Sequence, residues 1–170
     1  LTVLRGGRQV ARGNLSEKIG RTMIEDFFAA FMASEARGRP RIVEAADGHT
    51  MSDHNNPVLS VINLASVADM TRVVGKAVNP RRFRGNLLIA GAEPWQEFDW
   101  IGQKLRIGGA EMEITGRIDR CGATNVNPET AERDLNLPKS LQMGYGHIDC
   151  GVYARVTAGG QISRGDVISI

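Results

Sequence analysis

Cys121 is the residue of this chain with the clearest chemical potential. It follows a predicted strand and precedes a loop containing glycine and proline, so we expect its side chain at a strand end, facing open space. Arg117, Arg120 and Arg133 flank it. Nearby cations stabilise a thiolate over a thiol, and the thiolate is both the nucleophile and the soft metal ligand. The alternative is that Cys121 is a small buried hydrophobe, as free cysteines usually are.

A second candidate is the basic segment Arg81-Arg-Phe-Arg-Gly-Asn86, which leads directly into a predicted strand. Arg84 offers a forked donor that suits phosphate, and Asn86 offers a donor and an acceptor that suit the edge of a heterocycle. From these residues alone an exposed basic turn is the favoured interpretation.

A polar loop between two predicted strands holds His49 and His54 together with Asp47 and Asp53. These residue types can ligate a metal, but their spacing matches no helical or zinc-finger pattern. We therefore favour turn and capping roles for these side chains over a metal site.

A nucleophilic triad is a further alternative. His147 and Asp149 flank Cys150, and both would have to meet Cys121 in space. Nothing in the segment indicates that they converge, so the triad is disfavoured. The chain also lacks a Gly-x-x-x-x-Gly-Lys-Ser/Thr loop and a Gly-x-Ser-x-Gly motif, which argues against a P-loop nucleotide enzyme and a serine hydrolase.

The bulk composition is that of an ordinary globular domain. The 170 residues are 42 % hydrophobic and 24 % charged, and the net charge of +2 predicts no general affinity for nucleic acid or membrane. Two cysteines make no disulfide framework. The sequence shows no transmembrane run and no signal peptide, so we expect a cytoplasmic protein. Because the chain begins at Leu1, we expect that an upstream piece has been lost.

The predicted elements are mostly short strands. One helix is predicted from a Ser16 cap to Ala36, with its apolar face turned to a core, and a second from an Asn63 cap to Gly75. Strands are predicted at Arg41–Ala45, Val58–Ile62, Asn86–Ala90, Lys104–Ile107, Ala110–Arg120, Gly151–Thr157 and Val167–Ile170. This pattern predicts a mainly β, α+β fold: a closed or nearly closed β-barrel with flanking helices, the first helix packed on its outside.

Several segments together resemble the MOSC family, the domain found at the C-terminus of molybdenum-cofactor sulfurases. The resemblance covers residues 41–170. It rests on Val58 to Met70, Arg82-Phe-Arg-Gly-Asn-Leu, Trp95-x-Glu97-x-x-Trp100-Ile-Gly102, Leu105-Arg-Ile-Gly108, Arg120-Cys121-x-x-Thr124-x-x-x-Pro128-x-Thr130, Gly151-Val-Tyr153 and Gly160-x-Ile162-x-x-Gly165-Asp166. Residues 1–40 resemble the end of the N-terminal domain that accompanies MOSC in the molybdenum amidoxime-reducing proteins.

The resemblance implies a MOSC-type β-barrel with flanking helices and makes Cys121 the reactive position. It implies that Cys121 either ligates the molybdenum of a pterin cofactor or carries sulfur as a persulfide. By the same resemblance the cofactor-binding positions are Arg84, Asn86, Ser60, Asn63, Thr124 and Tyr153. Cys150 falls where relatives are often aliphatic, so it is interpreted as core packing.

The leading functional hypothesis is therefore an oxidoreductase module that reduces N-oxygenated substrates with molybdenum cofactor. The chain has no iron–sulfur cysteine pattern, so electrons would come from a separate redox protein. The alternative is a sulfur-carrier or transferase module that receives a persulfide from a pyridoxal-phosphate-dependent cysteine desulfurase. A non-catalytic cofactor-delivery module is the third possibility.

Overall fold

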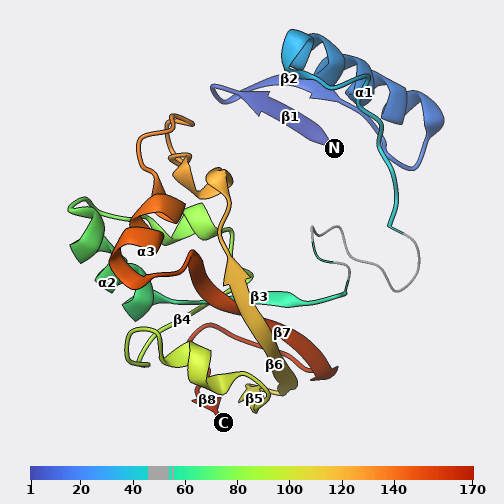
Figure 1. Ribbon diagram of the computed structural model, residues 1–170. Helices are drawn as coiled ribbons and strands as arrows, with labels where there is room; N and C mark the ends of the chain where they lie inside the picture. The colour runs from blue at the N-terminus through green and yellow to red at the C-terminus, as the bar shows by residue number, and fades with distance from the viewer. Residues whose placement is uncertain (46–53, 55) are drawn as a thin grey trace. The chain divides into compact units, whose positions relative to one another are not determined.

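The computed structural model describes residues 1–45, 54 and 56–170. The chain divides into two compact units, Leu1–Met51 and Ser52–Ile170, which are described separately (Figure 1). The predicted assignment of residues 1–40 to a partner domain stays a prediction. Among the helices in the described ranges, none has the length and apolar character that a bilayer-spanning segment requires.

The first unit is a hairpin with a helix. Strands β1 (Thr2–Arg5) and β2 (Arg8–Arg12) pair antiparallel around two glycines with positive φ, and α1 (Lys18–Met32) follows, continued by η1 (Ala33–Glu35). The predicted helix is confirmed, but it begins after Glu17, which makes no side-chain cap bond. The sequence did not reveal the hairpin, because its strands are short, contain three arginines and are mostly exposed.

The predicted strand at Arg41–Ala45 is wrong, because the helix binds this segment where a strand partner would be needed. The backbone N–H of Ile42 donates to Glu25 Oε1 at 2.8 Å. Within α1 only Gly20 and Ile24 are buried, and the apolar residues Ile19 and Phe31 are exposed. The predicted packing of α1 on the outside of the barrel stays a prediction.

The second unit is built on one curled, six-stranded sheet (Figure 1). Its strands are β3 (Leu59–Asn63), β4 (Leu87–Ile89), β5 (Lys104–Ile107), β6 (Ala110–Asp119), β7 (Asp149–Ala158) and β8 (Ile168–Ser169). The order is β4-β3-β7-β6-β5-β8; β3 and β4 are parallel, and the other pairs are antiparallel. The mainly β, α+β prediction with flanking helices is confirmed, the sheet being a half-barrel.

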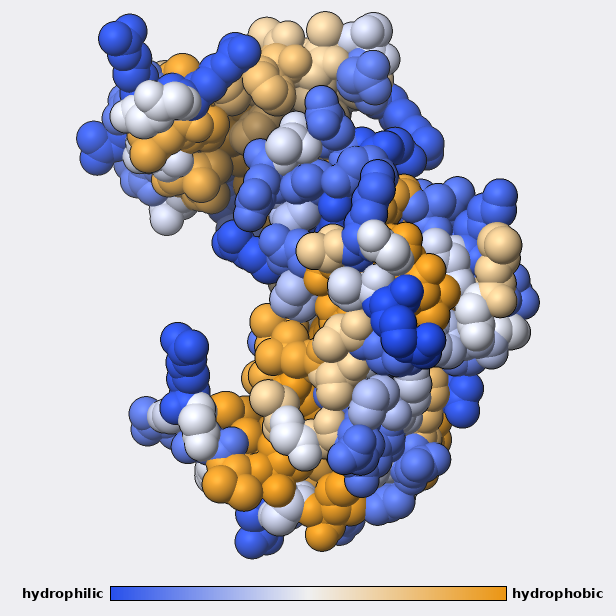
Figure 2. Space-filling model, turned by 90° about the vertical axis from the view of Figure 1, so that its left-hand side faces the viewer, coloured by the Kyte–Doolittle hydropathy of each residue, from blue (hydrophilic) through white to orange (hydrophobic). Residues whose placement is uncertain are grey.

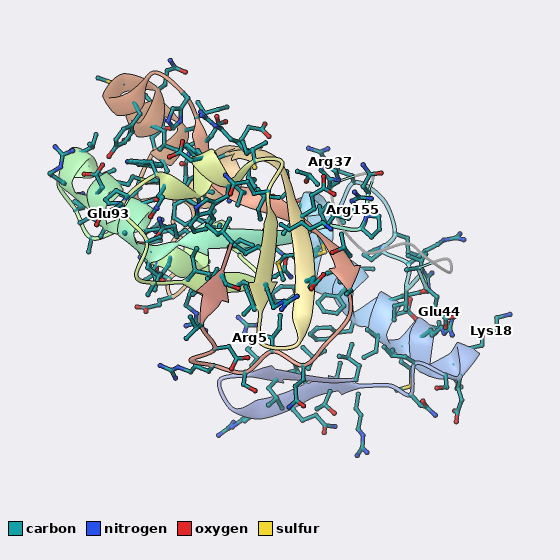
Figure 3. The ribbon with its side chains drawn as sticks, turned by 90° about the horizontal axis from the view of Figure 1, so that it is seen from below. Arg5, Lys18, Arg37, Glu44, Glu93 and Arg155 are labelled. Atoms are coloured by element: carbon teal, nitrogen blue, oxygen red, sulfur yellow. The ribbon has the colours of Figure 1, made fainter. Side chains whose placement is uncertain are left out.

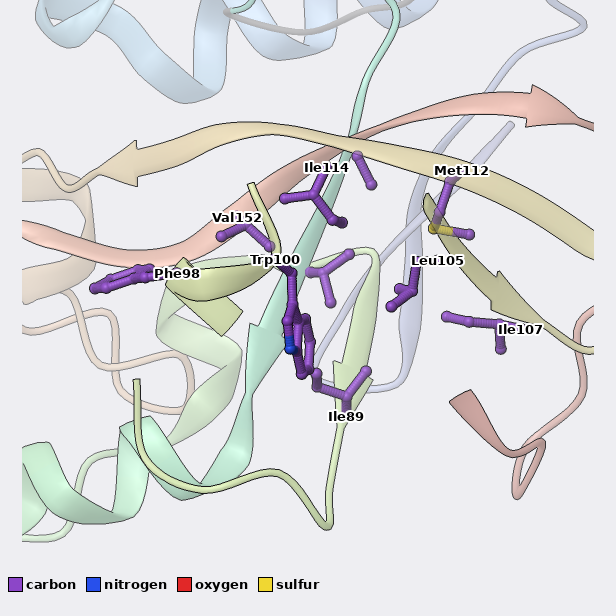
Figure 4. Close-up of a cluster of buried hydrophobic side chains, with 10 residues drawn as sticks. Ile89, Phe98, Trp100, Leu105, Ile107, Met112, Ile114 and Val152 are labelled. Atoms are coloured by element: carbon purple, nitrogen blue, oxygen red, sulfur yellow. The ribbon is translucent and has the colours of Figure 1, made fainter. Parts of the chain in front are cut away.

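The inner face of the sheet carries the main core. Alternation along β6 and β7 turns the fully buried Met112, Ile114, Val152 and Ala154 to this side. Figure 4 shows this cluster, whose labelled members are Ile89, Phe98, Trp100, Leu105, Ile107, Met112, Ile114 and Val152. Glu113 and Tyr153, which lie between these residues on the same strands, are turned to the other face.

Two helices cover one end of the sheet. The predicted second helix is confirmed as α2 (Leu64–Val74): the Asn63 side chain accepts from Ala65 N–H at 3.0 Å, and Gly75 ends it with φ +72. The third, α3 (Leu137–Tyr145), was not predicted. Both helices bury apolar residues with Ile62 and Cys150 in a second cluster. The short helices η2 (Pro80–Phe83), η3 (Gln96–Trp100) and η4 (Gly122–Asn125) complete the unit.

Candidate thiol pocket

Cys121 lies where β6 has ended and η4 begins, and it is exposed. Its own carbonyl accepts from the Thr124 side-chain hydroxyl at 2.9 Å and from the Thr124 N–H at 3.2 Å, which fixes the turn. The Cys121 thiol makes no hydrogen bond with any residue in the described part of the chain. The structure therefore presents this sulfur at a strand end, facing outward, as the sequence predicted.

The thiol opens into a pocket of ≈ 870 Å³, a size usual for small-molecule sites. The pocket is lined by His54, Asn56, Val58, Thr115, Gly116, Arg117, Asp119, Cys121, Tyr153 and Arg155. Of the predicted cofactor contacts, Tyr153 shares this pocket with Cys121. Arg155 projects from β7 (Figure 3) and pairs with Glu113 on the neighbouring strand.

Tyr153 begins a polar row that crosses the sheet on the face opposite the core. Ser60 on β3 is its partner in the β3–β7 ladder. The Ser60 hydroxyl donates to Asn86 Oδ1 at 2.8 Å, and the Ser60 N–H donates to the same oxygen at 2.9 Å. Three predicted contact residues are thus adjacent, on three neighbouring strand segments.

Asn86 also reaches a second pocket, of ≈ 830 Å³, between β4 and the C-terminal segment. The residues that line it are mainly apolar and include Leu87, Ile89, Trp100, Ile107, Ile162 and Ile168. Figure 2 shows apolar side chains gathered at the lower end of the second unit, where Figure 1 places β5, β8 and the C-terminus. Asn86 lines only this second pocket, and Cys121 lines only the first.

Two other predicted contact residues are buried within the protein. Asn63 is fully buried; besides capping α2, its amide donates to Glu97 Oε2 and to the Glu93 carbonyl, each at 2.8 Å. Thr124 is 4 % exposed and holds the Cys121 turn. These contacts position the elements around the pocket, and direct cofactor contact by either residue stays a prediction.

The three arginines of the basic segment occupy different environments. Arg82 is buried, donates from Nη1 to the Asn125 carbonyl at 3.0 Å, and pairs through Nη2 with Asp134 at 2.7 Å. This hydrogen bond lowers the pKa of the Asp134 carboxyl. Arg84 is exposed in a left-handed conformation (φ +52), and its guanidinium makes no hydrogen bond or ion pair within the described residues. Arg84 is therefore available to an anion, as is Arg81, which is also exposed.

Two of the three cations expected around the thiol, Arg117 and Arg120, are engaged elsewhere. Arg117 stacks on the Phe98 ring, 4.2 Å from its centroid, and lies 3.9 Å from Asp149. Arg120 is buried, and its guanidinium donates to the Cys150 and Phe83 carbonyls. Burial lowers the pKa of Arg120. The sequence placed these cations near Cys121, but it did not reveal that protein groups already bind them.

The histidine alternatives receive no support from the described residues. The His147 ring packs among Trp95, Phe98 and Tyr145, and its Nδ1 accepts from the Asp149 N–H at 3.1 Å. The His54 ring packs against Tyr153. His49, Asp47 and Asp53 lie outside the described residues. In the ranges that are described, no group of three metal-ligating side chains occurs.

Cys150 differs from Cys121 in its burial and in the availability of its thiol. It is fully buried in the second core cluster, as expected for a packing residue. Burial raises the pKa of the Cys150 thiol to about 12, with the Arg120 cation acting in the opposite direction. At neutral pH Cys150 is therefore a protonated hydrophobe, and Cys121 is the thiol available for chemistry.

Comparison with known proteins finds similarity to two kinds of protein over part of the chain. It is 29 % identical over 113 residues to molybdenum cofactor sulfurase of Danio rerio, covering 58 % of this chain and 13 % of that one. It is 28 % identical over 125 residues to mitochondrial amidoxime reducing component 2 of Bos taurus, covering 66 % of this chain and 36 % of that one. The chain thus spans well under half the length of these relatives.

Among solved structures, the YuaD protein from Bacillus subtilis is similar with a TM-score of 0.49 and 16 % identity, over 65 % of this chain and 61 % of that one. A model of the MOSC domain matches residues 48–169, which include the whole six-stranded sheet, both of its helices and Cys121. This match covers most of the chain. The chain belongs to the MOSC domain family.

Proposed function

We propose that this chain is a molybdenum-cofactor-binding module in which Cys121 ligates the metal. One observation carries the proposal: in a MOSC domain, the exposed Cys121 thiol stands at a strand end and opens into a pocket of ≈ 870 Å³. Thiolate sulfur is a soft ligand of the kind that thiophilic metals prefer. The name of the relative in Danio rerio, molybdenum cofactor sulfurase, agrees with this cofactor chemistry, and the name of the relative in Bos taurus refers to amidoxime reduction.

Side chains of the second unit offer the groups that the parts of such a cofactor need. The metal needs a thiolate, and Cys150 is fully buried, which leaves Cys121. A phosphate needs a forked donor, and Arg84 is exposed with a guanidinium that no described residue occupies. The pterin edge needs paired donors and acceptors, which the Ser60–Asn86 pair and Tyr153 offer beside the pocket.

The proposed reaction is the reduction of an N-oxygenated substrate. An N-hydroxylated nitrogen takes up two electrons and two protons, its N–O bond breaks, and the oxygen leaves as water. The bound molybdenum would supply the two-electron oxygen-transfer chemistry. The chain's own part is to hold the cofactor through Cys121 and Arg84 and to receive the substrate in the thiol pocket. With only two cysteines in the chain, the electrons would come from a separate redox protein.

A second candidate function is a sulfur carrier, and the unobstructed thiol of Cys121 favours it as well. The Cys121 thiolate would attack the outer sulfur of a persulfide on a pyridoxal-phosphate-dependent cysteine desulfurase. One sulfur–sulfur bond would form on Cys121, one would break on the desulfurase, and the desulfurase thiolate would leave. The relative named molybdenum cofactor sulfurase is the comparison that suggests this reaction.

Metal and mass analysis of protein made in a cofactor-producing host distinguishes the two functions. We expect stoichiometric molybdenum in the wild type and in Cys150→Ser, and none in Cys121→Ser. A mass increase of one sulfur atom on Cys121, without molybdenum, would support the sulfur carrier instead. Full molybdenum retention in Cys121→Ser would contradict both assignments of this residue.

A further inference from the structure

Arg120 joins three segments of the second unit at the base of the thiol-bearing loop. It immediately precedes Cys121 and is 8 % exposed. Its Nε donates to the Cys150 carbonyl at 2.7 Å, and its Nη2 donates to the same oxygen. Its Nη1 donates to the Phe83 carbonyl at 3.3 Å, and the guanidinium lies over the Phe83 ring. The end of β6, the start of β7 and the η2 turn are therefore held by one side chain.

The burial of the Arg120 guanidinium costs free energy, which indicates that this side chain does more than fill space. A guanidinium loses much of its hydration on burial. Hydrogen bonds to carbonyl groups compensate for this loss less well than an ion pair with a carboxylate does. No carboxylate among the described residues pairs with Arg120. An apolar side chain of similar volume would fill the site without that cost, but it would leave the carbonyls of Phe83 and Cys150 without these donors.

The backbone of β7 provides the room that Arg120 needs. Gly151 has φ +80, and a Cβ there would lie 3.2 Å from Arg120 Nη2 and 2.5 Å from the Val61 carbonyl oxygen. A larger residue at position 151 would therefore disturb both the β3–β7 approach and the guanidinium.

The turn that Arg120 holds is the turn that presents Arg84. Arg84 directly follows Phe83, whose carbonyl accepts from Arg120. Arg82, in the same turn, binds the Asn125 carbonyl and Asp134 in the loop that follows Cys121. Two buried arginines thus bind the Arg84 turn to the segments on either side of the thiol.

We propose that Arg120 is a positioning residue that fixes the Arg84 guanidinium relative to the Cys121 thiol, so that both engage one anionic, metal-bearing ligand. The identity of that ligand rests on the proposed function. The positioning itself is a property of the protein alone, and can be measured without the ligand. Arg120 acts here through Arg84 and the Cys121 turn and does not touch the ligand.

The first experiment measures amide hydrogen exchange in metal-free Arg120→Met. Two backbone N–H groups report on the two turns. The Arg84 N–H donates to the Arg81 carbonyl, and the Thr124 N–H donates to the Cys121 carbonyl. We expect both to exchange roughly tenfold faster relative to Ile114 in the core, the effect of losing one charge-assisted hydrogen bond. Arg81→Ala, an exposed arginine of the same turn, is the control and should leave the Thr124 rate unchanged. No relative acceleration at Arg84 would overturn the proposal.

The second experiment is a double-mutant cycle on molybdenum retention. We expect Arg84→Ala and Arg120→Met each to lower retention roughly tenfold, and the double variant to lose little more than either, because Arg120 acts through Arg84. A loss in the double variant equal to the product of the two single losses would overturn the proposal. Full molybdenum retention in Arg120→Met would overturn it as well. Arg120→Lys keeps the charge but lacks the planar fork, so it should not restore retention; full restoration would assign the effect to charge and also overturn it.

The two experiments separate the two proposals. If wild-type protein binds no molybdenum while the Arg84 and Thr124 amides accelerate together in Arg120→Met, the proposed function fails and the positioning by Arg120 stands. If molybdenum is bound but the amides do not respond, the positioning fails and the proposed function stands.

Discussion

At the scale of single residues, the two cysteines have opposite roles because one is exposed at a strand end and the other is sealed in a core. The MOSC resemblance predicted the packing role of Cys150, and the sequence itself predicted the exposed Cys121, which follows a strand and precedes a loop. The sequence could not predict the division among the arginines. Arg82 and Arg84 have the same local character, and only the distant Asn125 carbonyl and Asp134 decide which one is buried.

The different environments of the two thiols predict different reactivity. Cys121 should react with iodoacetamide at neutral pH in metal-free protein, and Cys150 should react only on unfolding, because it is fully buried. Mass spectrometry of time points after mixing would locate the modified thiol. Equal rates for the two cysteines would contradict the assignment of Cys121 as the available thiol.

The buried thiol of Cys150 also predicts a pH dependence of stability. Its folded pKa is raised to about 12, above that of an unfolded cysteine, so its stabilising contribution is complete below about pH 8.5 and is lost as pH rises toward 12. The difference in unfolding free energy between the wild type and Cys150→Ala should be constant up to that pH and then fall by about 1.4 kcal/mol per pH unit. Urea titrations at several pH values measure this difference. A constant difference up to pH 11 would argue against it.

The guanidinium of Arg84 gives a third prediction at this scale. Arg84→Ala should weaken cofactor binding by about 1.5–3 kcal/mol if a charge-assisted contact is lost. Arg84→Lys should recover only part of that loss, because it keeps the charge without the fork. Cofactor release measured by dialysis, with Arg81→Ala as the exposed control, tests this. Unchanged retention in Arg84→Ala would leave Arg84 as an ordinary exposed turn residue.

At the scale of elements, the positions of strands and helices follow from the sequence where the apolar pattern is strong. The Asn63 cap and the Gly75 end of α2 could be predicted because the capping residues and the periodicity of the apolar residues agree there. Helix α3 was missed, because it has only nine residues and includes both Pro138 and Gly144. The strand at Arg41–Ala45 was wrongly predicted: the Ile42 N–H bonds to the Glu25 side chain, and Val43 is exposed.

A buried polar network at the start of α2 should be the most sensitive feature of that element. Asn63 caps the helix and donates to the buried Glu97, which also accepts from the Ser66 hydroxyl at 2.8 Å. Asn63→Ala removes a cap and a buried hydrogen bond, so it should cost about 2–4 kcal/mol of unfolding free energy. Asn79→Ala, which removes the cap of η2, should cost about 1 kcal/mol. If urea titrations gave similar losses of unfolding free energy for Asn63→Ala and Asn79→Ala, Glu97 would not need its buried hydrogen-bond partner.

At the scale of the whole molecule, the half-barrel brings together residues that are distant in sequence. Ser60, Asn86 and Tyr153 become neighbours only through the β3–β4 and β3–β7 pairings, which no local pattern reveals. The MOSC resemblance supplied these positions before the structure did, whereas the buried hydrogen bonds of Arg82 and Arg120 came from the structure alone.

The central claim is that Cys121 ligates molybdenum, and X-ray absorption at the molybdenum edge tests it most directly. The measurement compares wild-type protein with Cys121→Ser, both purified from a cofactor-producing host. Our account predicts sulfur from the protein in the wild-type metal shell, and either no metal or a shell poorer in sulfur in Cys121→Ser. Full molybdenum occupancy with an unchanged spectrum in Cys121→Ser would contradict it.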